Sequence, residues 1–409
     1  MIKKAFFLPG QGSQYKGMGK KLCENFKTAS DVFEEASEAL NEDIKKLCFE
    51  GDNETLTLTK NAQPALVTMA MAMYKVCVEE VGITPNIFAG HSIGEISALT
   101  CAGAIDFADA VKIARVRGEL MQRDVAAGQG KMAAVRSRDI NRILEILSEV
   151  SNQNEFVGVS NYNSNVQTVI SGHTKAVDLA SERLEKEGCK VTPLNVSAPF
   201  HCPLMQNAAD SFEEELKKYT FHDFTTPVLS NVDALPYTGK EQIIEHLTKQ
   251  LVLPVRWVES MVYLKKFMVS YGVELGPGNV LRNMMKTNIS DIRIYAFDDD
   301  KEIEKLKTYV ENSYVPFLSR CLGIAVATQN HNFDNKEYEA GVITPYNQIE
   351  ALSKKVESQG RKANQEEMEQ GLNWLVKIMQ TKGVTQEEQK ERLYHLFYDT
   401  NSLDVFANN

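Results

Sequence analysis

The chain has 409 residues, enough for two or three domains or for one large domain with insertions. A hydrophobic fraction of 43% and a charged fraction of 24% are ordinary for a soluble globular protein. The formal net charge of −10 argues against nucleic acid or an anionic membrane surface as the main partner.

The cysteines and the N-terminus predict a cytoplasmic protein. Seven cysteines are scattered without a Cys-x-x-Cys pair, which favours reduced thiols over a disulfide framework or a zinc site. The apolar run from Ala5 to Leu8 is too short for a signal-peptide core and ends in Pro9-Gly10, so it predicts a first strand. No window approaches the roughly 20 continuous apolar residues of a membrane span.

The first third of the chain alternates strand-like and helical patterns. A glycine-rich loop follows the first strand, and Pro64 is suited to the first turn of the second helix. The expected elements are a strand at 5–8, helices at about 17–40 and 61–80, a strand at 87–89, and helices at about 92–102 and 107–123.

A serine between two glycines lies where the short strand meets the next helix, in Gly90-His91-Ser92-Ile93-Gly94-Glu95. This pattern predicts a nucleophile elbow, a turn so sharp that side chains at the flanking glycine positions would clash. The elbow lifts the Ser92 hydroxyl above the sheet and points the next helix N-terminus at it, which suits an acyl-enzyme and its oxyanion.

The middle of the chain predicts a small inserted subdomain. Its strand-helix-strand-strand-helix-strand order is that of ferredoxin-like folds. The expected elements are strands at 131–136, 156–160, 166–171 and 190–196, with helices at 138–149 and 174–186.

The remaining sequence returns to the larger subdomain and ends in a tail without a recognisable catalytic motif. The larger subdomain is expected to add helices at about 203–218, 240–250, 256–268 and 279–286, and strands at 227–230, 272–275 and 292–296. In the tail, strands are expected at 324–328 and 340–344, and helices at 364–381 and from Thr385 onward.

Ser92 needs a base, because a hydroxyl at its ordinary pKa is a poor nucleophile. Among the seven histidines, His201 alone follows a strand end and a Pro-Phe turn and precedes a helix, a place where α/β folds gather ligand-binding side chains. A packed or surface histidine is the competing interpretation. His91 adjoins the serine but is expected to point away from it.

Two other features have both a functional and a structural interpretation. Arg117 is either a carboxylate clamp or part of a solvated helix face, and Arg115 lies about 200° away on the helix, so at most one of them should point inward. The backbone N–H groups of Gln11 and Ile93 would make an oxyanion hole, although the glycine-rich loop also suits a plain turn. Gly276-Pro277-Gly278-Asn279 fits a simple turn better than a functional loop.

These residues resemble the malonyl-CoA:acyl carrier protein transacylases, including the stand-alone acyltransferases of trans-acting polyketide synthases. The similar segments occur in order over about residues 4–295, some 70% of the chain. They are Leu8 to Gln14, Gln63-Pro64-Ala65, Gly90 to Glu95, Arg117 to Gln122, Asn161 to Ser164, Val169 to Gly172, Val196 to His201, Ser230-Asn231-Val232, Gln250 to Trp257, and Glu274 to Gly278.

The resemblance implies a role for each matching residue. Ser92 would be acylated with His201 as its base, and the backbone carbonyl of Gln250 would orient the imidazole. Gln11 and Ile93 would supply the oxyanion hole. The resemblance further places three residues in substrate binding, with the arginine on the malonyl carboxylate and the phenylalanine beside the malonyl α-carbon: Arg117, Phe200 and His91.

Two positions depart from the family pattern. Ile93 replaces the usual leucine but keeps the backbone N–H, and Pro199 replaces a smaller residue, which restricts the loop before His201 and bears on extender selectivity. The expected fold is α/β, with an α/β-hydrolase-like subdomain at 1–127 and 197–299, a ferredoxin-like subdomain at 128–196, and a C-terminal extension at 300–409.

The resemblance therefore predicts a monomeric malonyltransferase that uses malonyl-CoA and a phosphopantetheinylated acyl carrier protein, without a metal or redox cofactor. The pathway would be fatty acid or polyketide assembly, and the tail favours a polyketide synthase complex. Two alternatives stay open: a proofreading hydrolase of carrier-bound acyl groups, for which Arg117 would be of no use, and an idle scaffold component, which the intact site residues disfavour.

Overall fold

The computed structural model describes residues 2–123, 128–196, 198–402 and 405–406. The chain divides into two compact units, Ile2–Leu306 and Lys307–Asn409. The subdomain boundaries expected at 127/128 and 196/197, and Ser197 of the motif before His201, involve residues outside the described ranges.

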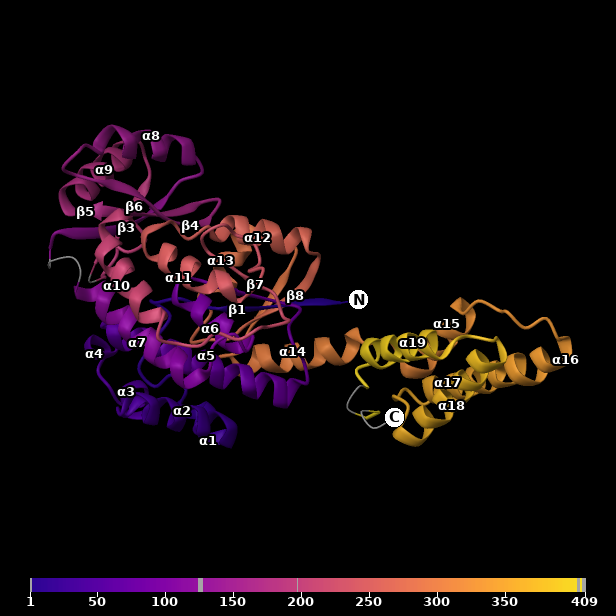
Figure 1. The fold of residues 1–409 in the computed structure, drawn as a ribbon. Coiled ribbons are helices and arrows are strands. Elements are labelled where there is room, and N and C mark those ends of the chain that lie inside the picture. Colours follow the sequence, from indigo (N-terminus) through magenta and orange to yellow (C-terminus); the bar gives the residue numbers. More distant parts are fainter. Residues whose placement is uncertain (1, 124–127, 197, 403–404, 407–409) are drawn as a thin grey trace. The chain divides into compact units, whose positions relative to one another are not determined.

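A five-stranded parallel sheet lies at the centre of the larger unit, in the order β7-β2-β1-β8-β9 (Figure 1). Its strands are β1 (Lys3–Leu8), β2 (Ile87–Gly90), β7 (Val228–Leu229), β8 (Val269–Glu274) and β9 (Arg293–Ala296). The register pairs Leu8 with Gly90, so β1 and β2 end at the same edge of the sheet. The glycine-rich loop and the elbow therefore leave the sheet side by side, where parallel sheets bind ligands.

Helices cover both faces of this sheet, which is why β1 is continuously apolar from Ala5 to Leu8. Phe7 points to the face covered by α12 (Trp257–Lys266) and α13 (Val280–Asn288), and packs against Trp257. Phe6 points to the opposite face and meets Tyr74 of α5 (Thr59–Val81). Because α5 begins at Thr59, Pro64 lies inside this helix, and its expected place in the first turn was wrong.

The other predicted helices of the larger unit are present, one of them divided, and two short helices at Ile44–Phe49 and Asn53–Thr57 were not predicted. Extended backbone at Phe26 separates two helices where the sequence predicted one, at about 17–40. These elements are α1 (Lys20–Asn25), α2 (Lys27–Leu40), α3 (Ile44–Phe49), α4 (Asn53–Thr57), α6 (Ile93–Cys101), α7 (Phe107–Arg123), α10 (Gln206–Leu216) and α11 (Ile243–Val252), with short 3-10 turns η1 (Pro203–Met205) and η2 (Lys240–Gln242).

The inserted subdomain has an antiparallel sheet in the order β4-β5-β3-β6, the ferredoxin-like arrangement (Figure 1). Its elements are β3 (Gly130–Arg136), α8 (Ile140–Val150), β4 (Val157–Ser164), β5 (Gln167–His173), α9 (Thr174–Lys186) and β6 (Lys190–Pro193). Ala133 and Val135 face the core under α8 and α9, so the alternating residue Met132 points to the opposite face. The predicted α/β class with a ferredoxin-like insertion is confirmed.

The smaller unit is helical, and the two strands expected there were wrong. Its elements are α15 (Phe317–Ala327), α16 (Asn335–Tyr338), the π-helical turn η3 (Glu339–Ile343), α17 (Thr344–Ser358), α18 (Gln365–Thr381) and α19 (Gln386–Asp399), while α14 (Asp300–Ser313) crosses the division at Leu306. Leu318, Cys321 and Ile324 recur at helical spacing and are buried in this unit's own core, so the apolar run at 324–328 ends a helix.

Within the described residues, no helix is both long and apolar enough to cross a membrane. The seven cysteines are all free thiols.

Candidate active site

The turn between β2 and α6 is a nucleophile elbow. Ser92 has φ 53° and ψ −112°, a backbone conformation that costs a residue with a side chain about 1–3 kcal/mol. A Cβ on Gly90 would lie 1.9 Å from the Gly94 carbonyl oxygen, and a Cβ on Gly94 would lie 2.1 Å from the Leu8 carbonyl oxygen. Both flanking glycines are therefore required, because a Cβ at either position would clash with backbone atoms. No side-chain movement could relieve such a clash.

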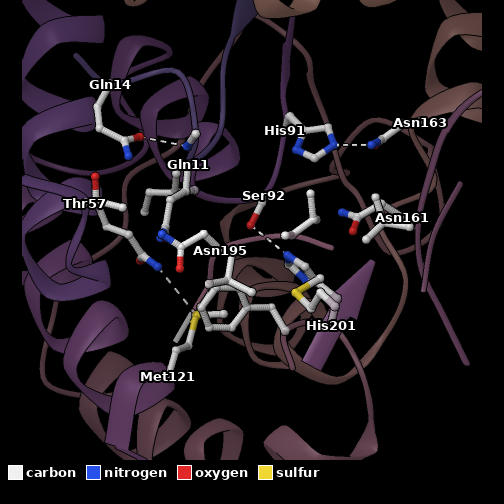
Figure 2. Close-up of a pocket in the computed structure, with 18 residues that line it drawn as sticks. Gln11, Gln14, Thr57, His91, Ser92, Met121, Asn161, Asn163, Asn195 and His201 are labelled. Carbon is white, nitrogen blue, oxygen red and sulfur yellow. Dashed lines mark hydrogen bonds between the residues drawn. The ribbon is translucent and has the colours of Figure 1, made fainter. Parts of the chain in front are cut away.

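Ser92 and His201 point toward one another, and Figure 2 shows the hydrogen bond between them. His201 Nε2 lies 2.8 Å from Ser92 Oγ, and His201 Nδ1 lies 2.7 Å from the backbone carbonyl oxygen of Gln250. A carbonyl only accepts, so Nδ1 carries the proton and Nε2 is left to accept from the serine hydroxyl. Pro199 does not prevent the loop before His201 from reaching this geometry. The ring of Pro199 packs close to Gly130.

Burial keeps His201 neutral. Its side chain is buried, and this burial together with the nearby Arg117 charge lowers the pKa of His201 to about 3. Hydrogen bonding to the Gln250 carbonyl acts in the opposite direction but is the weaker effect. A neutral imidazole can take the serine proton, so the pair is poised for nucleophilic attack.

Gln11 and Ile93 lie on the wall of the same cavity as Ser92. Gln11 follows β1 and Ile93 begins α6, so their backbone N–H groups come from the two adjacent strand ends. The Gly12 N–H donates to Gln14 Oε1 at 2.7 Å, which holds the glycine-rich loop in shape. This arrangement suits an oxyanion that forms at an acyl group on Ser92.

Arg117 projects from α7 to the site and is 1% exposed. Its Nη1 donates to Gln63 Oε1 at 2.9 Å, and its Nη2 donates to Gln250 Oε1 at 2.7 Å and to Ser92 Oγ at 3.2 Å. These partners are all neutral. Burial lowers the pKa of Arg117 to about 10, so the guanidinium is still charged at neutral pH.

Arg115 and Arg117 of α7 are both buried, so the expectation that at most one of them would point inward was wrong. Arg115 donates to Asn61 Oδ1 at 2.7 Å and pairs with Glu42 in the turn after α2, a helix that packs against α7. Neighbouring elements cover α7 on two sides. A helical wheel that assumes a single covered face could not predict that Arg115 and Arg117 are both buried. Only Arg117 reaches Ser92.

The cavity around Ser92 has a volume of about 300 Å³ and is lined from both subdomains (Figure 2). Its wall is partly apolar, with Phe200 beside His201 and with Met121, Met132 and Val196. The polar part comes mainly from amides: Gln11, Gln14, Gln63, Asn161, Asn163 and Asn195. An apolar wall with a few convergent polar groups is typical of a small-molecule site.

His91 lies on the cavity wall but turns away from His201. Its Nε2 lies 2.8 Å from Asn163 Oδ1 (Figure 2). Its ring meets Trp257 edge-on, with centroids 5.4 Å apart. Burial lowers the pKa of His91. The side chain therefore joins the elbow to β4 of the inserted subdomain and is not placed to act as the base.

A polar network that was not predicted from the sequence lies behind the elbow. Glu95 is buried, and burial raises its pKa to about 7 against its hydrogen bonds and the Arg117 charge. Asn231 accepts from the Ser92 N–H at 2.7 Å and donates to the Gly90 carbonyl at 2.7 Å. Both residues lie in segments already matched to the family, and that match was the only signal that could have marked them.

Most of the chain is similar in sequence to known proteins. The family model described as the acyl transferase domain matches residues 5–308. A malonyl CoA-acyl carrier protein transacylase of Bacillus subtilis is 40% identical over 396 residues, which is 95% of this chain and 99% of that protein. This match extends into the smaller unit, because it covers more of the chain than the larger unit contains.

Two solved structures match the larger part of the chain. The malonyl CoA-acyl carrier protein transacylase from Coxiella burnetii has a TM-score of 0.73 and 37% identity, covering 76% of this chain and 98% of its own. A malonyl-transacylase in complex with a type II polyketide synthase acyl-carrier protein has a TM-score of 0.72 and 38% identity, covering 76% and 99%.

Proposed function

This chain belongs to the acyl transferase domain family, and from this membership we propose that it transfers malonyl from malonyl-CoA to the phosphopantetheine thiol of an acyl carrier protein. The observation that carries the proposal is a single cluster: the Ser92–His201 pair with the buried cation of Arg117 beside the serine. The pair supplies acyl transfer, and the cation supplies a partner for a free carboxylate.

The reaction proceeds in two half-reactions on Ser92. His201 Nε2 takes the hydroxyl proton while Ser92 Oγ attacks the thioester carbon of malonyl-CoA, with Gln11 and Ile93 donating to the oxyanion. The carbon–sulfur bond breaks, and CoA leaves as the thiol with the proton from His201. The carrier thiol then gives its proton to His201 and attacks the malonyl ester, and Ser92 leaves with that proton.

Substrate choice follows from the two ends of the malonyl group. Arg117 takes the carboxylate, and an acyl group without one would leave the buried guanidinium without that partner. Phe200 occupies the wall beside His201, where it restricts branching at the α-carbon. His91 and Asn163 close the wall on the side of the inserted subdomain.

The intact mass of the protein after incubation with malonyl-CoA tests this function, beside Ser92→Ala. We expect one malonyl adduct on the wild type and none on the variant. A chase with carrier protein should move the adduct to the carrier thiol, and a chase with buffer should leave it in place. Absence of a malonyl adduct, with release of acyl groups from a preloaded carrier, would instead identify a proofreading hydrolase. Absence of both activities would leave the scaffold role.

We further propose that the malonyl group is supplied to a polyketide synthase. Two findings support this pathway: one solved relative is a malonyl-transacylase bound to a polyketide synthase carrier protein, and the chain carries an additional unit after Leu306. Transfer rates to a polyketide carrier protein and to the fatty acid carrier protein of the same cell would test it. Faster transfer to the fatty acid carrier would contradict the assignment.

A further inference from the structure

A buried carboxylate lies behind the site and has no part in the reaction described above. Glu95 is the third residue after Ser92, on α6, and is 0% exposed. It accepts hydrogen bonds from Gln250 Nε2 at 2.5 Å, the Asn231 N–H at 3.0 Å and the Tyr237 hydroxyl at 2.5 Å. Asn231 and Tyr237 lie in the loop after β7 and Gln250 lies on α11, and they donate to both carboxylate oxygens, so the carboxylate is held in one orientation.

The side chain of Gln250 connects this carboxylate to Arg117. Its Nε2 faces the Glu95 carboxylate and also the Ser92 carbonyl oxygen, at 3.1 Å, and both of these groups only accept when Glu95 is ionised. Its Oε1 accepts from Arg117 Nη2 at 2.7 Å. A rotated amide would put its NH₂ group against the guanidinium and its oxygen against the carboxylate. Glu95 is the nearest of three acceptors at Nε2, the others being the Ser92 carbonyl and Asn231 Oδ1 at 3.4 Å, so it contributes most to which end of the Gln250 amide Arg117 meets.

The position of the guanidinium depends on this amide oxygen. Gln63 holds Nη1 from one side, and Gln250 holds Nη2 from the other, so the same Nη2 remains within 3.2 Å of Ser92 Oγ. Both anchors are neutral, so neither competes as a carboxylate for the charge that the substrate needs. Loss of the Gln250 anchor would free Nη2 to move away from Ser92.

We propose that Glu95 is a positioning residue for malonyl recognition: it orients the Gln250 amide, which holds the Arg117 guanidinium beside Ser92. This inference rests on the proposed malonyl transfer, because it names the groups that set acyl selectivity at that site. Removing the Glu95 acceptor should lower the preference for malonyl over acetyl and leave the Ser92–His201 pair in place. A purely structural Glu95 would lower both activities alike.

The experiment compares three variants of the full-length chain at pH 8.5, where Glu95 is ionised. The measured quantity is the ratio of kcat/KM for malonyl-CoA to kcat/KM for acetyl-CoA. Glu95→Leu removes the acceptor and should lower this ratio about tenfold to a hundredfold, the range for a hydrogen bond to a charged group. Glu95→Gln keeps an oxygen for Gln250 Nε2 and should hold the ratio within about threefold of the wild type.

Tyr237→Phe is the matched control, because it removes one donor to Glu95 at a buried site without touching Gln250. Its ratio should equal that of the wild type, because Tyr237 donates to Oε1, whereas the Asn231 N–H still holds Oε2, the oxygen that faces Gln250. Equal losses for both substrates in Glu95→Leu, or a lowered ratio in Tyr237→Phe, would overturn the positioning role.

A second variant covers the case in which Glu95→Leu does not fold. Gln250→Met keeps the backbone carbonyl that His201 uses but removes the amide, and the malonyl-to-acetyl ratio must fall by the same factor. An unchanged ratio overturns the proposal. The wild type distinguishes failure of the proposed function from failure of the Glu95 role. If the wild type forms no malonyl adduct, the proposed function is wrong. If the wild type forms the adduct but the variants keep its malonyl-to-acetyl ratio, only the role of Glu95 is wrong.

Discussion

Arg117 concentrates the substrate preference of the proposed reaction in one buried cation. The sequence offered two interpretations of this residue, and burial at 1% exposure with neutral partners excludes the solvated helix face. A buried cation is costly unless something compensates it, and a substrate carboxylate beside Ser92 would do so. The residue is therefore expected to act on substrate choice more than on chemistry.

Arg117→Ala should lower kcat/KM for malonyl-CoA about a hundredfold, because two hydrogen bonds to a charged group are lost. Acetyl-CoA makes no such bonds, so its kcat/KM should stay within about threefold. Arg115→Ala is the control, since Arg115 is also buried on α7 but bonds to Asn61 and Glu42, away from Ser92. Equal losses for malonyl and acetyl in Arg117→Ala would contradict the carboxylate role.

The pH dependence of acylation should reflect the environment of His201. Burial and the Arg117 charge lower its pKa to about 3, and the neutral imidazole is the active base. A lowered pKa keeps the base in its active form as the pH falls, so this group should cause no loss of rate between about pH 8 and pH 5. Burst acylation by acetyl-CoA, which does not involve the carboxylate clamp, measures this dependence. A loss of rate centred near the ordinary histidine pKa of about 6.5 would contradict the prediction.

At the scale of elements, the elbow is determined by backbone contacts between a strand and a helix. Gly94 lies where α6 crosses the end of β1, and a Cβ there would meet the Leu8 carbonyl oxygen at 2.1 Å. The glycine pattern in the sequence was sufficient to predict this turn. The contact that makes Gly94 necessary is with β1, which is remote in sequence.

Gly94→Ala should destabilise the protein by about 3 kcal/mol, because backbone atoms on both sides must separate to admit the methyl group. Acylation of Ser92 should also fall, since the turn that presents the hydroxyl moves. Gly103→Ala provides the comparison: Gly103 has φ +83° but open space around its Cβ position, so only about 1 kcal/mol is expected. Urea unfolding of both variants measures the difference, and equal destabilisation would refute the clash with β1.

Elements were predicted best where a pattern was long and periodic. The helix at 107–123 and the helix at 174–186 have the predicted bounds. The tail strands were wrong because a short apolar run has no period of its own, and neighbouring helices decided that 317–327 is helical. Pro64 was misplaced because α5 begins five residues earlier, without a side-chain cap at its N-terminus that the sequence could reveal.

At the scale of the whole molecule, the chain consists of two units with separate cores. The match to the solved relative from Coxiella burnetii spans 98% of that chain but only 76% of this one. The structure of that similar protein therefore has no counterpart of the smaller unit. The core of the smaller unit is formed by residues of α15, α17, α18 and α19 together with η3.

A chain that ends after Ser313, and so keeps α14 whole, should remain soluble and cooperative in thermal unfolding. Its malonyl adduct should form at a rate within about threefold of the full-length protein, as expected for an independent domain. Transfer to the cognate carrier protein should fall if the smaller unit docks that partner. Aggregation of the shortened chain would instead assign the smaller unit a structural role.

The sequence by itself determined the chemistry that the site offers and the order of its parts. Local patterns can be recognised in a sequence without a structure. They include Ser92 between glycines, His201 after a strand end, and the matched segments around Arg117 and Gln250. Only the tertiary structure decided which of these groups meet, how deeply Arg117 is buried, and that Glu95 stands behind Gln250. The physical reason is that burial, pKa and hydrogen-bond direction belong to contacts between residues that are far apart in the chain.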